Sequence, residues 1–364
     1  MVVRQKTRMI RLGNLRVGRG APVSVQSMTK TDTRDVESTL KQAKRLEAVG
    51  CEVIRMAVPD REAAEKLAIY KGALKVPLVA DIHFDYRLAL AALEAGVDGL
   101  RINPGNIGAR WKVKEVVEAA RERMVPIRIG VNAGSLERDI LHRYGYPHPR
   151  ALVESALRHV ILLEDLGYLE MKVSLKASGV METVEAYRIF SRLRDYPLHL
   201  GVTEAGAWES GVVKSVEGIS ILLAQGIGDT LRVSLTGDPV QEVKIGLEIL
   251  RALGLRRDKV EIISCPTCGR CNWDLMSMVE AVRERLEHVR VPLKVAVMGC
   301  EVNGPGEARE AHVGLAGGKD KALLFVKGKV VAKVSMEEAL EALVNLVEEV
   351  AQEEEVLCKH RKDA

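Results

Sequence analysis

Eight short apolar segments alternate with stretches of helical periodicity along residues 1–255, and this alternation constrains the fold more than any other feature. The segments are rich in β-branched residues, which suit a pleated sheet. The strand candidates are Val23–Met28, Glu52–Val58, Leu78–His83, Gly99–Asn103, Ile127–Asn132, Met171–Lys176, His199–Glu204 and Thr230–Leu235. Eight strand–helix units in about 250 residues predict a (β/α)8 TIM barrel. An open doubly wound sheet is the alternative, although no G-x-G-x-x-G turn follows the first strand.

A smaller α+β domain is predicted to follow the barrel, so that the domains are residues 1–255 and 256–364. The boundary lies near Gly254. Beyond it, we expect strands at Glu261–Ser264 and Leu293–Met298, and helices at Asp274–Leu286 and Met336–Glu354. Ala311–Leu315 and Ala322–Val334 suggest a further sheet, with a hairpin turn at Lys327–Lys329.

Composition excludes several classes of protein. Of the 364 residues, 47% are hydrophobic and 29% charged, which is typical of a globular protein. No apolar run approaches the ~20 residues that span a bilayer, and residues 1–6 lack the apolar core of a signal peptide. We therefore expect a cytoplasmic protein without a membrane segment. A net charge of +4, with three Phe and three Trp, also disfavours nucleic-acid binding.

Polar residues stand at the carboxyl end of every predicted strand. In a TIM barrel these ends surround the mouth at which active sites lie. A single strand-end Arg is usually a solvated or paired residue, but here the pattern recurs from strand to strand. The residues are Gln26, Ser27, Arg55, Asp81, His83, Arg101, Asn103, Arg128, Asn132, Lys176, Glu204, Arg232 and Ser234.

Five cations in this set predict an anionic ligand, because like charges brought into one cavity repel each other unless an anion lies between them. Guanidinium groups bind phosphate through two hydrogen bonds, and lysine adds a point charge. The sequence therefore predicts a ligand with two phosphates or a diphosphate. The five cations are Arg55, Arg101, Arg128, Lys176 and Arg232.

The other strand-end residues suggest further roles. Asn132 and Ser234 can donate hydrogen bonds to phosphate oxygens. Glu204 is a carboxylate among cations, so it either pairs with an arginine or acts as acid or base on a substrate hydroxyl; we prefer the second role. Asp81 and His83 are interpreted as an orienting pair.

A C-x-x-C pair and a distant third cysteine predict a metal centre in the second domain. Cys265 and Cys268 lie in the segment SCPTCGRC, and Cys300 begins CEVNGPGE, which ends at Glu307. Thiolates select zinc, copper or iron–sulfur clusters. The cysteines alone leave structural zinc and an iron–sulfur cluster both open, since Cys271 also has suitable spacing. His288 and His312 do not have zinc-finger spacing.

These motifs together resemble the bacterial 4-hydroxy-3-methylbut-2-en-1-yl diphosphate synthase family of the non-mevalonate isoprenoid pathway. The resemblance covers nearly the whole chain. It rests on the segments Val25–Thr29 (VQSMT), Ala80–Phe84 (ADIHF), Arg101–Asn106 (RINPGN), Gly130–Ser135 (GVNAGS), Ser264–Arg270 (SCPTCGR) and Gly299–Glu307 (GCEVNGPGE).

The resemblance implies a [4Fe–4S] cluster held by Cys265, Cys268, Cys300 and Glu307, with Cys271 outside the ligand set. It implies a TIM barrel that binds 2-C-methyl-D-erythritol 2,4-cyclodiphosphate. The implied reaction is a two-electron reductive dehydration with ring opening, and ferredoxin or flavodoxin supplies the electrons. It also implies a head-to-tail homodimer, in which the cluster domain of one subunit covers the barrel of the other.

Two other functions are alternatives to the reductive enzyme. A barrel enzyme that binds a phosphorylated or pterin substrate, with a structural zinc domain, would keep its activity without iron. A non-catalytic iron–sulfur carrier or sensor would leave the five cations and Glu204 without a role, and replacing Arg232 would then leave function intact.

Overall fold

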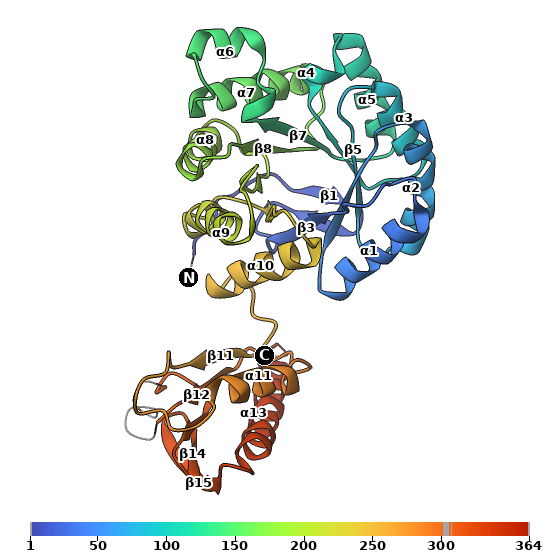
Figure 1. The fold of residues 1–364 in the computed structure, drawn as a ribbon. Coiled ribbons are helices and arrows are strands. Elements are labelled where there is room, and N and C mark those ends of the chain that lie inside the picture. Colours follow the sequence, from blue (N-terminus) through green and yellow to red (C-terminus); the bar gives the residue numbers. More distant parts are fainter. Residues whose placement is uncertain (1, 301–305, 307, 363–364) are drawn as a thin grey trace. The chain divides into compact units, whose positions relative to one another are not determined.

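The computed structural model describes residues 2–300, 306 and 308–362. The chain separates into two compact units, Met1–Arg256 and Arg257–Ala364 (Figure 1). Each unit has its own hydrophobic core, and each is described by itself.

The first unit is a barrel of eight parallel strands in the order β8-β7-β6-β5-β4-β3-β10-β9 (Figure 1). Among the described residues, one parallel bridge between Val173 and Leu198 joins β8 to β9 and nearly closes the ring. The predicted TIM barrel is therefore confirmed. Its strands are β3 (Ser24–Met28), β4 (Val53–Ala57), β5 (Leu78–Asp81), β6 (Gly99–Ile102), β7 (Ile127–Asn132), β8 (Met171–Lys176), β9 (His199–Leu200) and β10 (Thr230–Leu231).

Helices surround the strands, because the outward-facing strand residues are apolar. Ile127, Ile129 and Val131 of β7, for example, are fully buried in the core shared with the helices. The helices are α1 (Val36–Ala48), α2 (Arg61–Ala73), α3 (Tyr86–Glu94), α4 (Pro104–Ile107), α5 (Arg110–Glu122), α6 (Arg138–Tyr144), α7 (Pro149–Asp165), α8 (Val180–Leu193), α9 (Trp208–Ala224) and α10 (Pro239–Ala252), with a 3-10 turn η1 (Ala133–Ser135) after β7.

The last two barrel strands are shorter than the sequence predicts. Expected at His199–Glu204 and Thr230–Leu235, they end at Leu200 and Leu231. Gly201 has a φ of +154°, and a Cβ there would lie 2.6 Å from the Arg232 carbonyl oxygen and from Lys176 Nζ. The Leu235 amide donates to the Glu242 carboxylate rather than to a neighbouring strand. Beyond both strand ends the regular ladder is reduced to isolated backbone hydrogen bonds, such as those from the Arg232 amide to the Leu200 carbonyl oxygen and from the Thr203 amide to the Ala177 carbonyl oxygen.

A two-stranded hairpin, which the sequence reading did not predict, packs against the amino-terminal part of the barrel. It consists of β1 (Ile10–Leu12) and β2 (Leu15–Val17). Its apolar side chains form a small core with Val53 of β4 and Val79 of β5. Gly99 opens β6 without a side chain, and a Cβ there would lie 2.5 Å from Leu12 Cδ1. This end of the barrel is therefore filled by apolar residues.

The second unit is a five-stranded mixed sheet with helices, as predicted for an α+β domain. Strands β11, β12 and β13 are parallel, and β13, β14 and β15 are antiparallel. The elements are β11 (Glu261–Ser264), α11 (Leu275–Arg285), β12 (Lys294–Met298), β13 (Val313–Gly317), β14 (Lys321–Val326), β15 (Lys329–Ser335) and α13 (Ala339–Lys362).

The last helix differs from its predicted bounds of Met336–Glu354. It begins at Ala339, since Ser335 Oγ accepts the Glu338 amide at 3.3 Å and thereby forms a turn before the helix. It continues through the acidic run to Lys362, because glutamate and lysine both favour helix. None of the helices in the described part of the chain is long and apolar enough to cross a membrane.

Candidate functional site

The inward-facing side chains of the barrel are polar from the middle of the strands to the mouth. Strand alternation directs Arg128 of β7 and Ser174 of β8 inward, where Arg128 Nη1 donates to Ser174 Oγ at 3.1 Å. Ordinary TIM barrels fill this space with branched apolar residues. Burying so many polar and charged side chains therefore lowers the stability of the fold unless a ligand of opposite charge binds among them. The inward set comprises Ser24, Gln26, Arg55, Asp81, Arg101, Arg128, Lys172, Ser174, Lys176, His199, Thr230 and Arg232.

Asp81 is the buried anion at the centre of this set. Its carboxylate lies 3.7 Å from Arg55 Nε and 3.3 Å from Arg101 Nη1, and 3.4 Å from His83 Nε2. Burial alone would raise the pKa of Asp81, but Arg55, His83 and Arg101 more than offset it and lower that pKa. Asp81 therefore stays ionised and orients two arginines. His83 remains more than half exposed, so the pair suggested by the sequence is buried only at its acidic member.

The Arg101 side chain of β6 passes over Gly130 of the neighbouring strand β7. A Cβ on Gly130 would lie 2.6 Å from Arg101 Nε and 3.2 Å from its Cζ. Arg101 Nη2 also donates to the Gly130 carbonyl oxygen at 3.4 Å. The glycine is therefore required where the guanidinium passes.

We expect Gly130→Ala to displace the Arg101 guanidinium from Asp81 while leaving the fold intact, because the clashing atoms belong to the end of a flexible side chain. Affinity for inorganic pyrophosphate, measured by calorimetry, should fall by roughly 10- to 100-fold, the equivalent of one charge-assisted contact. Gly72→Ala in α2, where a Cβ would meet nothing within 4 Å, is the matched control. Unchanged affinity in Gly130→Ala would contradict this role for Arg101.

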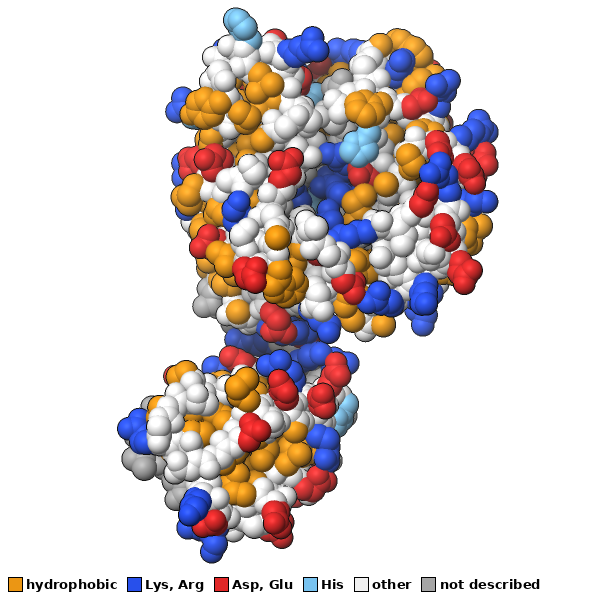
Figure 2. Space-filling view, viewed as in Figure 1, with side chains coloured by type: hydrophobic (Ala, Val, Ile, Leu, Met, Phe, Trp, Pro, Cys, Tyr) orange, Lys and Arg blue, Asp and Glu red, His pale blue; other side chains and the backbone are white. Residues whose placement is uncertain are grey.

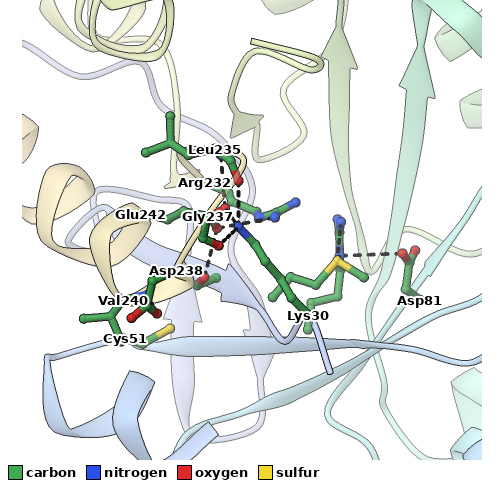
Figure 3. Close-up of polar contacts among 12 residues, drawn as sticks. Lys30, Cys51, Asp81, Arg232, Leu235, Gly237, Asp238, Val240 and Glu242 are labelled. Carbon is green, nitrogen blue, oxygen red and sulfur yellow. Dashed lines mark hydrogen bonds and ion pairs between the residues drawn. The ribbon is translucent and has the colours of Figure 1, made fainter. Parts of the chain in front are cut away.

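Arg232 is fixed by a second buried carboxylate, that of Glu242 on α10. Arg232 Nη2 lies 3.3 Å from Glu242 Oε2, and Lys30 Nζ lies 2.9 Å from Glu242 Oε1 (Figure 3). Ser27 Oγ donates to Glu242 Oε2 at 3.1 Å. The Lys30 ammonium also donates to the carbonyl oxygens of Leu235 and Gly237. The carboxylate of Glu242 thus joins the first and last strands of the barrel.

Three inward cations, Arg128, Lys172 and Lys176, have no carboxylate partner among the ion pairs found in the described residues. Arg128 and Lys176 are buried, with 2% and 6% of their surface exposed. Arg128 Nε and Nη2 have no hydrogen-bond partner in the described part of the chain. Burial, and then the charges of neighbouring cations, lower the pKa of both side chains well below their ordinary values. An anion in the hollow of the barrel face, at whose floor Figure 2 shows Lys and Arg side chains, would relieve this repulsion.

Arg55 is also nearly buried, and its pKa is lowered to about 10 by burial, against the opposing charge of Asp81. Its Nε and Nη2 lie 3.2 and 3.0 Å from Met28 Sδ. Since these contacts with a thioether are weak, Arg55 keeps most of its capacity to bind an anion.

The remaining predicted residues lie at the rim. Asn132 and Ser234 are half-buried at or just beyond the ends of β7 and β10. Glu204 is exposed, has a φ of +51°, and its Oε1 lies 3.9 Å from the position a Cβ on Gly134 would occupy. A positive φ in a glutamate costs about 1–2 kcal/mol. Glu204 therefore faces the η1 turn that follows Asn132, and it forms no ion pair among those found in the described residues.

Sequence reasoning missed four ionisable members of the site, in addition to the hydroxyl residues Ser24, Ser174 and Thr230 of the inward set. Lys172 and His199 are inward-facing residues deeper in the barrel, and the period-2 alternation from Lys176 and Gly201 would have found them. Lys30 and Glu242 come from a loop and a helix. The available signal for Glu242 was a single acidic residue on the face of α10 whose other residues are apolar or glycine.

The second unit brings cysteines to one edge of its sheet. Strands β11 and β12 are parallel neighbours, so Cys265 and Cys300, which follow them, lie at the same end. The Gly299 amide donates to Cys265 Sγ at 3.3 Å. A Cβ on Gly299 would lie 3.2 Å from Cys265 Sγ and 2.9 Å from Cys271 Sγ. The glycine thus makes room for two sulfurs, and its amide supports negative charge on one of them.

Cys268 and Cys271 complete the turn after Cys265. The Cys271 amide donates to the Cys268 carbonyl oxygen at 2.9 Å, and Cys268 is exposed. Glu307 lies outside the described residues. Within those residues, no three His, Cys, Asp or Glu side chains are already arranged to hold a metal ion. The donor set nevertheless fits a thiolate-held centre: the sulfurs are soft, partly accessible and gathered beside a backbone amide.

Comparison with known proteins supplies the context for both units. Residues 7–247 match the family model described as the GcpE TIM-barrel domain, and residues 261–349 match that of the GcpE protein C-terminal domain. A Geobacter sulfurreducens protein named 4-hydroxy-3-methylbut-2-en-1-yl diphosphate synthase (flavodoxin) is 59% identical over 351 residues, which cover 96% of this chain and 99% of that protein. A Thermodesulfovibrio yellowstonii protein of the same name is 58% identical over 344 residues, which cover 94% and 99%.

Proposed function

Because the chain belongs to the GcpE family, we propose that it catalyses the reductive ring opening of 2-C-methyl-D-erythritol 2,4-cyclodiphosphate to 4-hydroxy-3-methylbut-2-enyl diphosphate. Two electrons enter. The bond between carbon and the ring phosphate oxygen breaks, and a hydroxyl leaves as water. With the substrate as a dianion and the product as a trianion, one proton balances the reaction.

The cationic interior of the barrel is the observation that carries this proposal. Six buried or nearly buried cations face one another there, and Asp81 and Glu242 are the carboxylates that compensate them. A cyclic diphosphate brings two negative charges to this space and gains a third as the ring opens. The cations are Arg55, Arg101, Arg128, Lys172, Lys176 and Arg232.

The barrel residues act on the leaving diphosphate. Arg128 and Lys176, which lack compensation in the free barrel, stabilise the charge that grows on the phosphate oxygens as the ring opens. Asp81 and Glu242 hold Arg101 and Arg232 in fixed orientations, so little reorganisation is needed during the reaction. Asn132 and Ser234 are placed at the rim to donate hydrogen bonds to oxygens of the ligand.

Cys265, Cys268, Cys300 and Glu307 are proposed to hold a [4Fe–4S] cluster in the second unit. When bound there, the cluster supplies the two electrons one at a time. The Gly299 amide near Cys265 Sγ supports this assignment, because amide hydrogen bonds stabilise sulfur ligands of such clusters. The domain roles follow: residues 1–255 bind substrate and residues 256–364 carry the cluster.

Flavodoxin is proposed as the electron donor, since the relatives' names specify it, and ferredoxin offers the same one-electron chemistry. A head-to-tail homodimer in the cytoplasm completes the proposal. In that dimer the cluster unit of one subunit covers the barrel mouth of the other and excludes water from it.

Glu204 is proposed to deliver the proton that converts the departing hydroxyl to water. We expect Glu204→Gln to lower kcat by roughly 10²- to 10⁴-fold, the usual contribution of a general acid, while binding of the cyclic diphosphate changes by less than about threefold. Glu209→Gln, on an exposed residue in the first turn of α9, is the control. A parallel loss of binding and turnover in Glu204→Gln would instead assign Glu204 to substrate positioning.

The metal content of protein purified without oxygen tests the redox assignment. About four irons and four acid-labile sulfides per chain support the cluster. One zinc per chain without sulfide would support the other candidate, a phosphate-binding barrel with a structural zinc domain.

A further inference from the structure

Lys172 of β8 is a buried cation that the proposed diphosphate contacts do not use. It faces the barrel interior on the same side of β8 as Ser174 and Lys176, which follow it by two and four residues toward the mouth. Only 2% of its surface is exposed. Its register partner on β7 is Arg128. The Lys172 backbone therefore lies at the same level of the barrel as that of Arg128, and two residues along β8 before Ser174. Lys172 Nζ has no hydrogen-bond partner within the described part of the chain.

The groups that face Lys172 come from several elements of the barrel. Most are cations: Arg128 from β7, Arg55 from β4, Arg101 from β6 and Lys176 from its own strand. His199 of β9 adds an imidazole whose Nδ1 is 2.8 Å from Thr230 Oγ1, and burial lowers the pKa of that imidazole, so it is neutral. Asp229 opposes the cations by favouring the charged form of Lys172, although it also pairs with Arg4 at 2.8 Å. Asp81 pairs with Arg55 and Arg101.

The charge on Lys172 consequently depends on what occupies the mouth. In the free barrel, burial and then the charges of Arg128 and Arg55 lower the pKa of Lys172 to about 7. An anion bound against Arg128 and Lys176 removes the repulsion and favours the ammonium form. The cyclic diphosphate suits this role. Each of its phosphates is esterified and carries one charge, so the ligand itself releases no proton near neutral pH.

We propose that Lys172 is a proton-binding site coupled to occupation of the barrel mouth: it takes up a proton when the cyclic diphosphate binds. The inference rests on the proposed function, because it requires that ligand in the mouth. The ammonium then places a further positive charge beneath the diphosphate before the ring opens and the ligand gains its third negative charge. Lys172 does not touch the ligand in this proposal; it adds positive charge next to Arg128, which does.

The sign of the pH dependence follows from the direction of the pKa change. The ligand raises the pKa of Lys172 above its value in the free barrel, so affinity is highest below pH 7 and falls as pH rises through the window between the free and bound values. The slope in that window approaches tenfold per pH unit. The uptake contributed by Lys172, taken as the difference between wild type and Lys172→Met, should be close to one proton per bound ligand at pH 8, about one half at pH 7 and near zero at pH 5.5.

Calorimetric binding of the cyclic diphosphate to the full chain, in buffers of different ionisation enthalpy, measures this uptake. The difference between wild type and Lys172→Met should show the three values above, since Lys176 and His199, whose pKa values are also lowered in the free barrel, are present in both proteins. Lys172→Met should bind at least tenfold more weakly at pH 6. Lys172→Arg, which keeps a fixed charge, should take up no more protons than Lys172→Met, yet bind more tightly. Lys114→Met, an exposed lysine of α5, should behave as wild type.

The outcomes separate this inference from the proposed function. Binding by wild type without proton uptake at pH 8, or unchanged uptake in both Lys172 variants, would overturn the role of Lys172 and leave the proposed function standing. Failure of wild type to bind the cyclic diphosphate would overturn the proposed function, and the inference with it.

Discussion

Arg128→Met is expected to lower kcat/KM for the cyclic diphosphate by more than about a thousandfold and, at the same time, to stabilise the ligand-free protein. The catalytic loss combines a missing bidentate phosphate contact with missing stabilisation of the leaving diphosphate, and such donors are worth about 3–4 kcal/mol each. The gain in stability arises because Arg128 is buried with two guanidinium nitrogens unpaired in the described structure. Replacing buried charge by an apolar side chain of similar length stabilises proteins by about 1–4 kcal/mol.

Steady-state kinetics and denaturant unfolding of the same preparation check both parts of this expectation. Arg123→Met is the matched control, because Arg123 lies exposed at the end of α5 and should change neither quantity appreciably. Loss of activity together with loss of stability in Arg128→Met would mean that Arg128 supports the fold, and that the barrel interior is not strained in the absence of ligand. A fall in kcat/KM together with a rise in the free energy of unfolding is the result expected for a side chain that serves function at the expense of stability.

Cys265→Ser is expected to abolish activity, since a neutral hydroxyl does not replace a thiolate as a ligand of a [4Fe–4S] cluster. Iron and sulfide should fall well below four per chain, and visible absorption of the cluster should disappear. Cys271→Ser is the informative comparison. Its sulfur would lie 2.9 Å from a Cβ on Gly299, against 3.2 Å for the sulfur of Cys265, but the family resemblance excludes Cys271 from the ligand set. Cys271→Ser should therefore retain the full iron content. Loss of iron in this variant would mean that Cys271 is a ligand, in place of Cys268, Cys300 or Glu307.

The same two variants test the head-to-tail dimer. A mixture of Arg128→Met and Cys265→Ser chains, dissociated and reassociated, contains heterodimers with one intact barrel opposite one intact cluster unit. With random reassociation, about a quarter of wild-type activity should return, because half of the dimers each have one complete site. No recovery would contradict sharing of the site between subunits.

Sequence patterns predicted the parts of the barrel that follow from local periodicity. Arg55, Arg101, Arg128 and Lys176 lie on β4, β6, β7 and β8 as predicted, because alternation alone decides which side chains face inward. Arg128, predicted at a carboxyl end, is instead the second residue of β7. The five predicted cations all belong to the inward-facing set. The cysteine edge was predictable for a related reason, since two parallel strands that end at Ser264 and Met298 bring Cys265 and Cys300 to one side.

The remainder depends on contacts between distant residues, which no local pattern encodes. Glu242 accepts a hydrogen bond from Ser27, 215 positions earlier in the chain, and the same carboxylate pairs with Arg232. Lys172 was overlooked because only strand ends were treated as candidate site positions. The proximity of Cys271 to Gly299 depends on the path of the turn after β11, and the ligand role of Glu307 stays a prediction.

Turnover of the cyclic diphosphate tests the central claim most directly. Protein purified without oxygen, with its iron and sulfide measured, is mixed with chemically reduced flavodoxin and 2-C-methyl-D-erythritol 2,4-cyclodiphosphate, and the products are identified by mass spectrometry. We predict 4-hydroxy-3-methylbut-2-enyl diphosphate in an amount equal to half the electrons consumed, and none from Arg128→Met or Cys265→Ser. Iron-loaded, folded wild-type protein that leaves the cyclic diphosphate unchanged would contradict the account.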